Sequence, residues 1–490
     1  MKWKKLVLLG LCMALMGCGN AGNSGNGAGQ EGNGGGEFRS DIADTRANGR
    51  CEAGEANGGA GSEAGEANGE SRSEAGDISG EAQSQGGGSV VKLGTDEREE
   101  IPPVKLDNAF QRAAFLADQV YEADQKSTLV SPLSLEMALG LVTEGASGET
   151  AKELYKYLGN ENYADWAREY MDFAKSLDTK EALEMPSADG TEKLIFESGS
   201  RYTFHYELAN SIWVRQDDKL KEAYEKLVKE KFSAEAVNVD FAGEPTETAA
   251  RINGWCDEHT HGMIPKIVEP EMFSSDLAAI IMNTVYFESP WADKWGLVEH
   301  EFTDKEGNKT TREMLSDTLG VYYENEYATA FAKSYYNGFE FIGILPKQEG
   351  DFEISDLGLE SLLESKTYDV EVKAIAPKLN FDTATKPKQI VRILEAQGIH
   401  RAFQSDAAEF DRMVEERYLY IDDILQKCKI EMDEEGTRAA AVTAILMREA
   451  MAMAPEPKSV KEVYLDRPFA FLIYDSVNDQ IVFVGKVTEL

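Results

Sequence analysis

Cysteine is scarce in this chain, with five among 490 residues. Cys12 and Cys18 lie close to the N-terminus, Cys51 lies in a glycine-rich stretch, and only Cys256 and Cys428 fall in the remainder. This set supplies neither a disulfide framework nor a paired CxxC zinc motif. The stability of the folded part must therefore come from a large apolar core, which roughly 385 residues can supply.

Basic residues are few relative to acidic ones. There are 50 Lys and Arg against 88 Asp and Glu, which gives a formal net charge of −38. Nucleic-acid binding needs clustered Lys and Arg that contact phosphates, so this composition argues against a nucleic-acid partner. The acidity instead suits an exported protein with a soluble surface.

Motifs for catalysis and metal binding are also missing. His259 and His261 flank one threonine just after Cys256 and Asp257, a group of residue types that can bind a metal. No HExxH motif or distant ligand cluster completes the group, so we interpret these as surface residues and expect no metal site. There is no GxSxG elbow and no phosphate-binding loop. We therefore expect no enzymatic activity and no cofactor.

The apolar run near the N-terminus is too short to span a membrane. It extends from Leu6 to Leu15 behind three lysines, as in an export signal, and the segment from Leu15 to Cys18 resembles a bacterial lipobox. We predict that residues 1–18 are a lipoprotein signal peptide and that the Cys18 thiol is lipidated. An ordinary secretory signal with a chance cysteine is the alternative.

This interpretation places the protein in the cell envelope, lipid-anchored on the outer side of the cytoplasmic membrane or in the outer membrane; the extracellular space is a further option. Residues 19–104 are rich in Gly, Glu, Asn and Ser, with Phe38 as their only aromatic residue. Because such a segment cannot bury a core, we predict a disordered tether with a reach of about 50 Å. Residues 105–490 are then one folded domain.

Proline is absent between Gly436 and Ala454, within a segment that has strand-like features. Apolar and charged residues alternate from Cys428 to Met432, and small or apolar residues occupy every second position from Thr437 onward. Every backbone N–H of this stretch is free to join a ladder, so it is a candidate for a spare strand. Its Ala, Leu, Met, Arg and Glu content equally suits an exposed helix.

Several motifs flank this segment in a fixed order. They are Leu129-Val-Ser-Pro-Leu-Ser-Leu-Glu-Met-Ala-Leu-Gly, Ala209-Asn-Ser-Ile-Trp-Val, Met282-Asn-Thr-Val-Tyr-Phe, Glu434-Glu-Gly-Thr-Arg-Ala-Ala-Ala-Val-Thr and Asp466-Arg-Pro-Phe-Ala-Phe-Leu-Ile. Together they span roughly residues 105–490 and resemble the serpin family of serine-protease inhibitors. The resemblance implies an α+β fold: a large central β-sheet, two further sheets, about eight or nine helices and an exposed reactive loop.

The resemblance also implies a suicide-substrate mechanism. A target protease cleaves the reactive loop, at about residues 434–460, and forms an acyl-enzyme; the freed segment then inserts into the central sheet and traps the protease. The inward-facing positions from Thr437 carry no charge, which such burial requires. Arg438, on the outward set, departs from the family, which usually has Glu there. The implied hinge and inserting strand comprise Glu435, Gly436, Thr437, Ala439, Ala440, Ala441 and Thr443.

The usual loop length of the family, counted from Gly436, places the reactive bond at Ala450-Met451. A small or apolar residue at this bond suits elastase-like or subtilisin-like proteases. A frame shifted by two residues would present Arg448 to trypsin-like enzymes, and some cysteine proteases are further candidates.

Other positions resemble the residues that control sheet opening in the family. Ser131, Ser134 and Asn283 match a polar cluster beneath the sheet, and Trp291 matches the place where the loop enters. Gln426 stands where serpins often have histidine; it can still donate and accept hydrogen bonds, but does not titrate. Ordinary capping and core packing are the alternative roles of these residues.

The leading hypothesis is therefore a monomeric, lipid-anchored inhibitor of serine proteases. A serpin fold without inhibition, used as a binding or structural lipoprotein at the surface, is the second. An exported hydrolase is disfavoured by the missing catalytic motifs.

Overall fold

The computed structural model describes Leu93 and residues 100–159, 162–177, 205–335, 338–368, 370–415, 419–437 and 459–490, together with the backbone of a hairpin at 183–186 and 193–196. Within these ranges there are eight α-helices: α1 (Ala109–Asp124), α2 (Pro132–Gly145), α3 (Gly148–Leu158), α4 (Tyr163–Leu177), α5 (Glu222–Phe232), α6 (Pro245–His259), α7 (Leu359–Glu364) and α8 (Gln389–Ala396).

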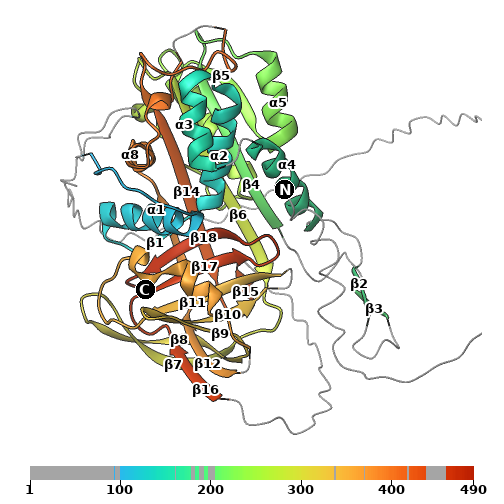
Figure 1. Ribbon diagram of the computed structural model, residues 1–490, viewed down its shortest axis with the longest axis vertical. Coiled ribbons are helices and arrows are strands. Elements are labelled where there is room, and N and C mark those ends of the chain that lie inside the picture. Colours follow the sequence, from blue (N-terminus) through green and yellow to red (C-terminus); the bar gives the residue numbers. More distant parts are fainter. Residues whose placement is uncertain are drawn as a thin grey trace, which may run out of the picture. The chain divides into compact units, whose positions relative to one another are not determined.

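A six-stranded sheet forms the centre of the described domain (Figure 1). Its strand order is β13 (Leu379–Ala384), β14 (Asp423–Met432), β15 (Gly436–Thr437), β6 (Ala279–Pro290), β4 (His205–Arg215) and β5 (Glu235–Val239). The two longest strands, β6 and β4, pair antiparallel from His205↔Glu288 to Val214↔Ala279. β14 and β6 run parallel, so a strand of opposite direction between them pairs antiparallel with both, as β15 does.

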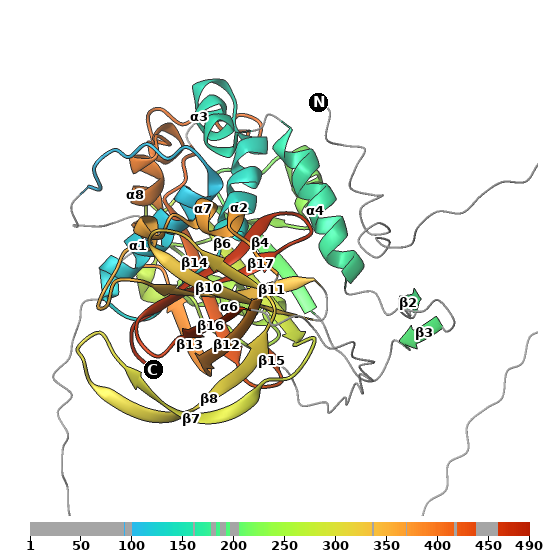
Figure 2. The same ribbon diagram turned by 60° about the horizontal axis from the view of Figure 1, so that its bottom comes forward.

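Two further sheets complete the α+β architecture, as predicted. One has the order β1 (Thr128–Val130), β18 (Gln480–Val487), β17 (Phe469–Asp475), β11 (Phe339–Pro346), β10 (Ala328–Ser334), β9 (Tyr322–Glu324). The other has the order β16 (Ser459–Tyr464), β12 (Val370–Pro377), β8 (Lys309–Leu319), β7 (Gly296–Thr303), and Figure 2 shows the curved β7–β8 ribbon at its edge. A small hairpin, β2 (Leu183–Pro186) with β3 (Lys193–Phe196), is an element that the sequence did not predict.

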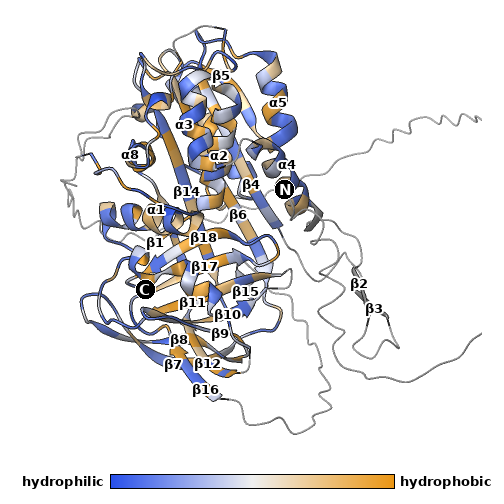
Figure 3. Cartoon of the chain, viewed as in Figure 1, coloured by the Kyte–Doolittle hydropathy of each residue, from blue (hydrophilic) through white to orange (hydrophobic). Residues whose placement is uncertain are grey.

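The central sheet is covered on both faces. Every residue of β6 from Ala279 to Ser289 is buried, as expected for a strand between two packed layers. Its colouring in Figure 3 is largely apolar, whereas α3 and α5 carry both polar and apolar residues. Ile281, Val285 and Phe287 belong to the main core that includes α2, while Ile280 and Met282 belong to a second core beneath α6. Neighbouring residues of one strand thus face different layers.

Leu93 belongs to this second core. Its side chain is fully buried, in a cluster with Ile252 and Trp255 of α6, Met282 of β6 and Leu425 of β14. Its backbone N–H donates to the Met272 carbonyl at 2.6 Å. The residues that pack in this domain therefore include Leu93, which precedes the described range that begins at residue 100.

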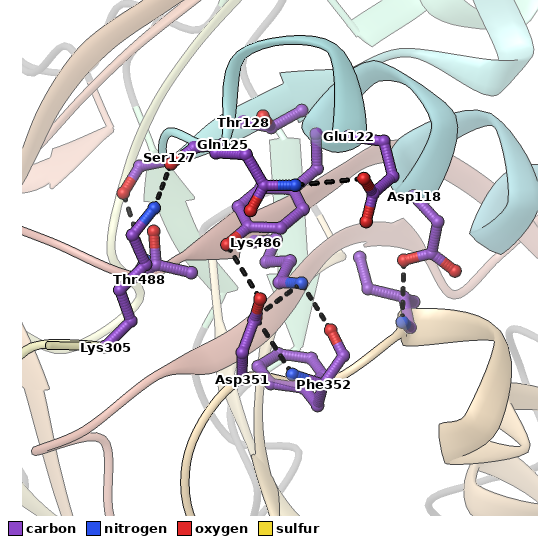
Figure 4. Close-up of polar contacts among 12 residues, drawn as sticks. Asp118, Glu122, Gln125, Ser127, Thr128, Lys305, Asp351, Phe352, Lys486 and Thr488 are labelled. Carbon is purple, nitrogen blue, oxygen red and sulfur yellow. Dashed lines mark hydrogen bonds and ion pairs between the residues drawn. The ribbon is translucent and has the colours of Figure 1, made fainter.

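A buried lysine connects β18 to the segment before α7 (Figure 4). The Lys486 ammonium lies 2.8 Å from Asp351 Oδ1, donates to the Phe352 carbonyl and sits 3.5 Å from the centroid of the Tyr121 ring. Burial opposes ionisation of Asp351, but the ammonium of Lys486 outweighs it and lowers the pKa of that carboxyl. The buried charge is thus paired, as burial of a charge requires.

In the part of the chain that the structure describes, no helix is both long and apolar enough to cross a membrane. Cys256 and Cys428 are buried free thiols. Burial raises the pKa of the Cys256 thiol to about 12, so it is not a reactive nucleophile.

Candidate functional site: the strand-entry point of the central sheet

The two residues of β15 lie between two strands that pair directly elsewhere. β14 and β6 pair in parallel from Asp423↔Ile280 to Lys427↔Thr284. Further along, Thr437 is opposite Met432 of β14 on one side and Ser289 of β6 on the other, antiparallel to both. The segment after Gly436 therefore begins as a strand within the central sheet.

The relative register of β14 and β6 is the same where the two strands pair directly and where β15 lies between them. Lys427 and Thr284 differ by 143 positions, and so do Met432 and Ser289. β15 thus separates β14 from β6 laterally, without sliding one along the other. We call the interval between β14 and β6 from Thr437 toward Thr284 the slot; its two edges keep the same register throughout.

Thr437 is held by an aromatic pair. Its hydroxyl lies 2.5 Å from the Tyr335 hydroxyl, and only 4% of the residue is exposed. The Tyr335 ring stacks on Trp291, with ring centroids 4.1 Å apart. Burial raises the pKa of Tyr335, so its hydroxyl stays protonated and available to this contact.

The chain enters the slot through a tight turn. Asp433 Oδ1 accepts from the N–H groups of Glu435 at 2.8 Å and Gly436 at 3.2 Å, and the Asp433 N–H donates to the Gly436 carbonyl at 2.9 Å. Trp291 binds the other side: its N–H donates to Glu435 at 3.0 Å and its indole Nε1–H to the Asp433 carbonyl at 2.8 Å. The backbone polar groups of the turn are therefore well satisfied.

Two lysines hold the acidic residues of this turn. Lys294 forms an ion pair with Glu435, and Lys378 lies 2.8 Å from both Glu434 and Glu313. The hydrogen bond from Lys378 lowers the pKa of Glu434. Sequence reasoning identified Trp291 but missed Tyr335 and both lysines, because no spacing rule connects them to a turn more than 50 positions away.

Beneath the sheet, Ser131, Ser134, Asn283 and Gln426 come together. All four are almost fully buried. The Gln426 amide accepts from the Ser131 N–H and donates to the Ser131 carbonyl, both at 2.9 Å. It also donates to Asn283 Oδ1 at 2.5 Å, while Asn283 Nδ2 donates to the Ser134 carbonyl at 2.7 Å. This polar network joins β14 and β6 to the start of α2.

Asn210 of β4 is a further member of this network. Its Oδ1 accepts from Asn283 Nδ2 at 2.6 Å, and it is directly opposite Asn283 in the β4–β6 ladder. The motif that starts at Ala209 was visible in the sequence, and an asparagine in the middle of an apolar strand was the available signal. Gln426 pairs with Asn283 in the β14–β6 ladder as well, so the network crosses three strands.

Many predicted site residues lie outside the described residues. These are Cys18, Ala439, Ala440, Ala441, Thr443, Ala450 and Met451. Their roles remain predictions.

The histidine group near the end of α6 is built from other partners than the sequence suggested. His259 Nδ1 contacts Glu207 Oε1 of β4, and His261 Nε2 lies 3.4 Å from Glu207 Oε2, whereas Cys256 faces the core. The hydrogen bond with Glu207 raises the pKa of His259. Among the described residues, no group of three or more His, Cys, Asp or Glu side chains is arranged to bind a metal ion.

Comparison with known proteins agrees with this geometry. Residues 108–490 match the family model described as serpin (serine protease inhibitor). An uncharacterized serpin-like protein of Thermococcus kodakarensis is 31% identical over 405 residues, covering 80% of this chain and 86% of the relative. Iripin-8 of Ixodes ricinus is 29% identical over 393 residues, covering 76% and 91%.

Solved structures show the same likeness. The thermophilic serpin tengpin in its native state is 26% identical with a TM-score of 0.63, covering 82% of this chain and 98% of tengpin. Serpin48 of Tenebrio molitor shares the fold with a TM-score of 0.64 at 23% identity, covering 78% and 97%. From the central sheet with its strand-entry point, and from these matches, we conclude that the chain belongs to the serpin family.

Proposed function

We propose that this protein inhibits serine proteases by acting as a suicide substrate. The observation that carries the proposal is the position of Thr437, between Met432 and Ser289 in a slot that continues in register. Because Thr437 already pairs with both neighbouring strands, this observation supports the proposal that the same strand lengthens once the loop is cut.

The chemistry belongs to the protease. Its serine hydroxyl attacks the Ala450 carbonyl, the amine of Met451 leaves, and an acyl-enzyme remains. Insertion of the segment after Thr437 carries the acylated protease away from its water-activating geometry. We place the cut at Ala450-Met451 and expect elastase-like or subtilisin-like targets; a cut next to Arg448 would instead indicate trypsin-like targets.

We further propose that the protein is exported, lipid-anchored through Cys18 and tethered by the predicted segment 19–104 as far as Leu93, which packs in the core of the domain. The lipobox-like segment and the composition of the tether support this placement. Detergent phase partitioning of the full chain from cells tests it: the wild type should enter the detergent phase and Cys18→Ser the aqueous phase. Equal partitioning of both would indicate an ordinary secretory signal.

Mixing the domain with subtilisin or elastase tests the inhibitory mechanism. We expect a covalent complex that survives SDS, with the cut site identified by sequencing of the released peptide. Thr437→Arg should abolish the complex, because an arginine at a position that is 4% exposed faces a desolvation cost of several kcal/mol. Thr311→Arg, on the exposed part of β8, is the matched control and should trap normally.

One outcome would favour the second hypothesis, a serpin-fold surface protein without inhibition. That outcome is cleavage of the loop by each protease with full protease activity retained and no complex formed.

A further inference from the structure

A cavity of about 290 Å³ lies beside the edge of the central sheet, away from the strand-entry point. The ladder between β5 and β4 runs from Ser211 to Arg215, and the cavity borders the preceding stretch of β4, residues 205–209. The C-terminal part of α4, the end of α6 and the turn after it supply further walls. This volume is at the lower end of the range for small-molecule sites, about 300–1,000 Å³.

The residues around this cavity are unusual for such an acidic chain. Three of the five histidines line it, namely His205, His259 and His261, and we call it the histidine cavity. Lys175 of α4 is a fourth basic lining residue, and Glu207 is the single acidic one. The whole chain has 88 acidic residues against 50 Lys and Arg, so the cavity reverses the prevailing sign. A local excess of basic groups favours an anion.

The turn after α6 positions the imidazole of His261. This residue has a φ of 48°, in the left-handed region that a non-glycine residue rarely adopts, and the Gly262 N–H closes the turn on the Asp257 carbonyl at 2.9 Å. The ring of His261 lies 4.5 Å from the ring of Tyr286 and 5.5 Å from that of His205, measured between centroids. The rings are therefore held at the cavity by the local backbone and by packing.

Glu207 does not oppose an anion as a free carboxylate would, because both of its oxygens contact histidines. Oε1 contacts His259 Nδ1, and Oε2 lies 3.4 Å from His261 Nε2. The hydrogen bond with Glu207 raises the pKa of His259 against the effect of burial, so this ring is charged at a higher pH than an ordinary histidine. Lys175 contacts the hydroxyl of Ser233.

Other carboxylates lie around the cavity without lining it. Glu235 of β5 and Glu258 of α6 act on His259 by charge, and Glu288 of β6 accepts from the Tyr286 hydroxyl at 2.7 Å. Histidine ordinarily gains its charge below about pH 6.5. Acidification therefore adds positive charge among the lining residues, where one carboxylate faces four basic groups.

Part of the lining is apolar. Met171 and Ala174 of α4 and Leu208 of β4 contribute to it, and each of them is buried. An inorganic anion would leave this apolar surface without a partner, whereas a short hydrocarbon tail gains free energy by covering it. The combination suits a ligand with one negative head and a short apolar tail.

We propose that the histidine cavity binds a small organic anion, a monocarboxylate with a short apolar tail, and binds it more tightly in acid. The head lies between Lys175 and the imidazoles, and the tail lies against Met171, Ala174 and Leu208. This site is independent of loop insertion, so it stands or falls separately from the proposed inhibitory function.

Titration of the full chain with hexanoate tests the proposal, with 1-hexanol and hexylamine as neutral and cationic probes of similar size. We expect hexanoate to bind about tenfold more tightly at pH 6.0 than at pH 8.0, since several imidazoles gain charge in between. Lys175→Gln should weaken binding about two- to fivefold, the range for one exposed charge pair. Lys152→Gln on α3 is the matched control, because its side chain is 70% exposed and lies outside the lining.

Nuclear magnetic resonance of the histidine rings locates the bound anion without any activity assay. Hexanoate should shift the ring signals of His205, His259 and His261, while His300 and His400 serve as internal controls and stay unchanged. The proposal is overturned if hexanoate shifts none of the three signals at pH 6.0, or if Lys175→Gln binds as tightly as Lys152→Gln. It is equally overturned if 1-hexanol or hexylamine binds as tightly as hexanoate, because the site would then not select a negative head.

Discussion

The indole of Trp291 lies flat against the ring of Tyr335, with an interplanar angle of 14°, and Tyr335 in turn contacts the hydroxyl of Thr437. One side chain thus binds the turn that leads into the slot, and its stacked neighbour binds the first inserted side chain. The entry point is held by packing and hydrogen bonding together.

Tyr335→Phe removes the hydrogen bond to Thr437 and keeps the ring stack. We expect a loss of about 0.5–1.5 kcal/mol of unfolding free energy, the net value of a typical hydrogen bond, and faster exchange of the Thr437 amide proton. Urea denaturation measures the unfolding free energy, and hydrogen exchange measures the exchange rate of the Thr437 amide proton. Tyr322→Phe is the control, since its hydroxyl bonds to Glu324 at 2.8 Å away from the slot; it should leave Thr437 exchange unchanged. If the Thr437 amide proton exchanges equally fast in Tyr335→Phe and wild type, the hydrogen bond between Tyr335 and Thr437 does not hold β15 in the sheet.

Gln426→His would introduce a titrating group into the network beneath the sheet. Burial disfavours the charged imidazole, so the folded-state pKa should lie below the ordinary value of about 6.5. The unfolded chain then binds more protons, and stability should fall as pH drops below about 6.5. The measurement is the difference in unfolding free energy between variant and wild type at pH 5.5 and 7.5.

Gln404→His provides the comparison, because Gln404 is exposed. Its difference from wild type should be nearly independent of pH. The same flat profile for Gln426→His would mean that the buried site hydrates or rearranges to accept the charge.

The contact of His259 with Glu207 should make stability depend on pH in the opposite direction. Its folded-state pKa is raised, chiefly by the Glu207 hydrogen bond and against the effect of burial. The contribution is therefore complete below about pH 6.5 and is lost as pH rises through the folded-state value. We expect about 0.2–1 kcal/mol for this partly exposed pair, measured as the difference between wild type and His259→Gln across pH 5 to 8.5.

Two further carboxylates act on His259, namely Glu235 of the neighbouring strand β5 and Glu258, the preceding residue of α6 itself. Glu207→Gln in the His259→Gln background should add little. A large additional loss would show that Glu207 acts through another partner, such as His261.

Leu93→Ala tests whether the segment before the main described range stabilises the domain. Leu93 is fully buried beneath α6, so truncation should cost on the order of 2–3 kcal/mol, the lower part of the range for buried leucines. Chemical denaturation measures it, with Leu297→Ala as control because that side chain is 45% exposed. If the unfolding free energy falls no more than in the control, the burial of Leu93 does not stabilise the domain.

The fold could be predicted because its motifs are local runs in a fixed order. The alternation from Cys428 to Met432 predicted the buried side of β14 correctly: Cys428, Ile430 and Met432 are all buried. The partners of the entry point could not be predicted. Tyr335 lies 102 positions from Thr437, and only tertiary packing brings such residues together. The burial of Leu93 could not be predicted either, because a single leucine in a polar segment gives no hydrophobic periodicity.

The offset between β14 and β6 is 143 positions both in their direct ladder and across β15, and this equality has a kinetic consequence for the proposed mechanism. A new strand in a sheet ordinarily has to find its alignment, at an entropic cost that slows non-local pairing. In the proposed mechanism, Gly436 and Thr437 are the nucleus from which the strand extends, between two edges that are already aligned. The proposed mechanism then predicts that the delay before extension is set by the time that β14 and β6 need to separate, one residue pair after another.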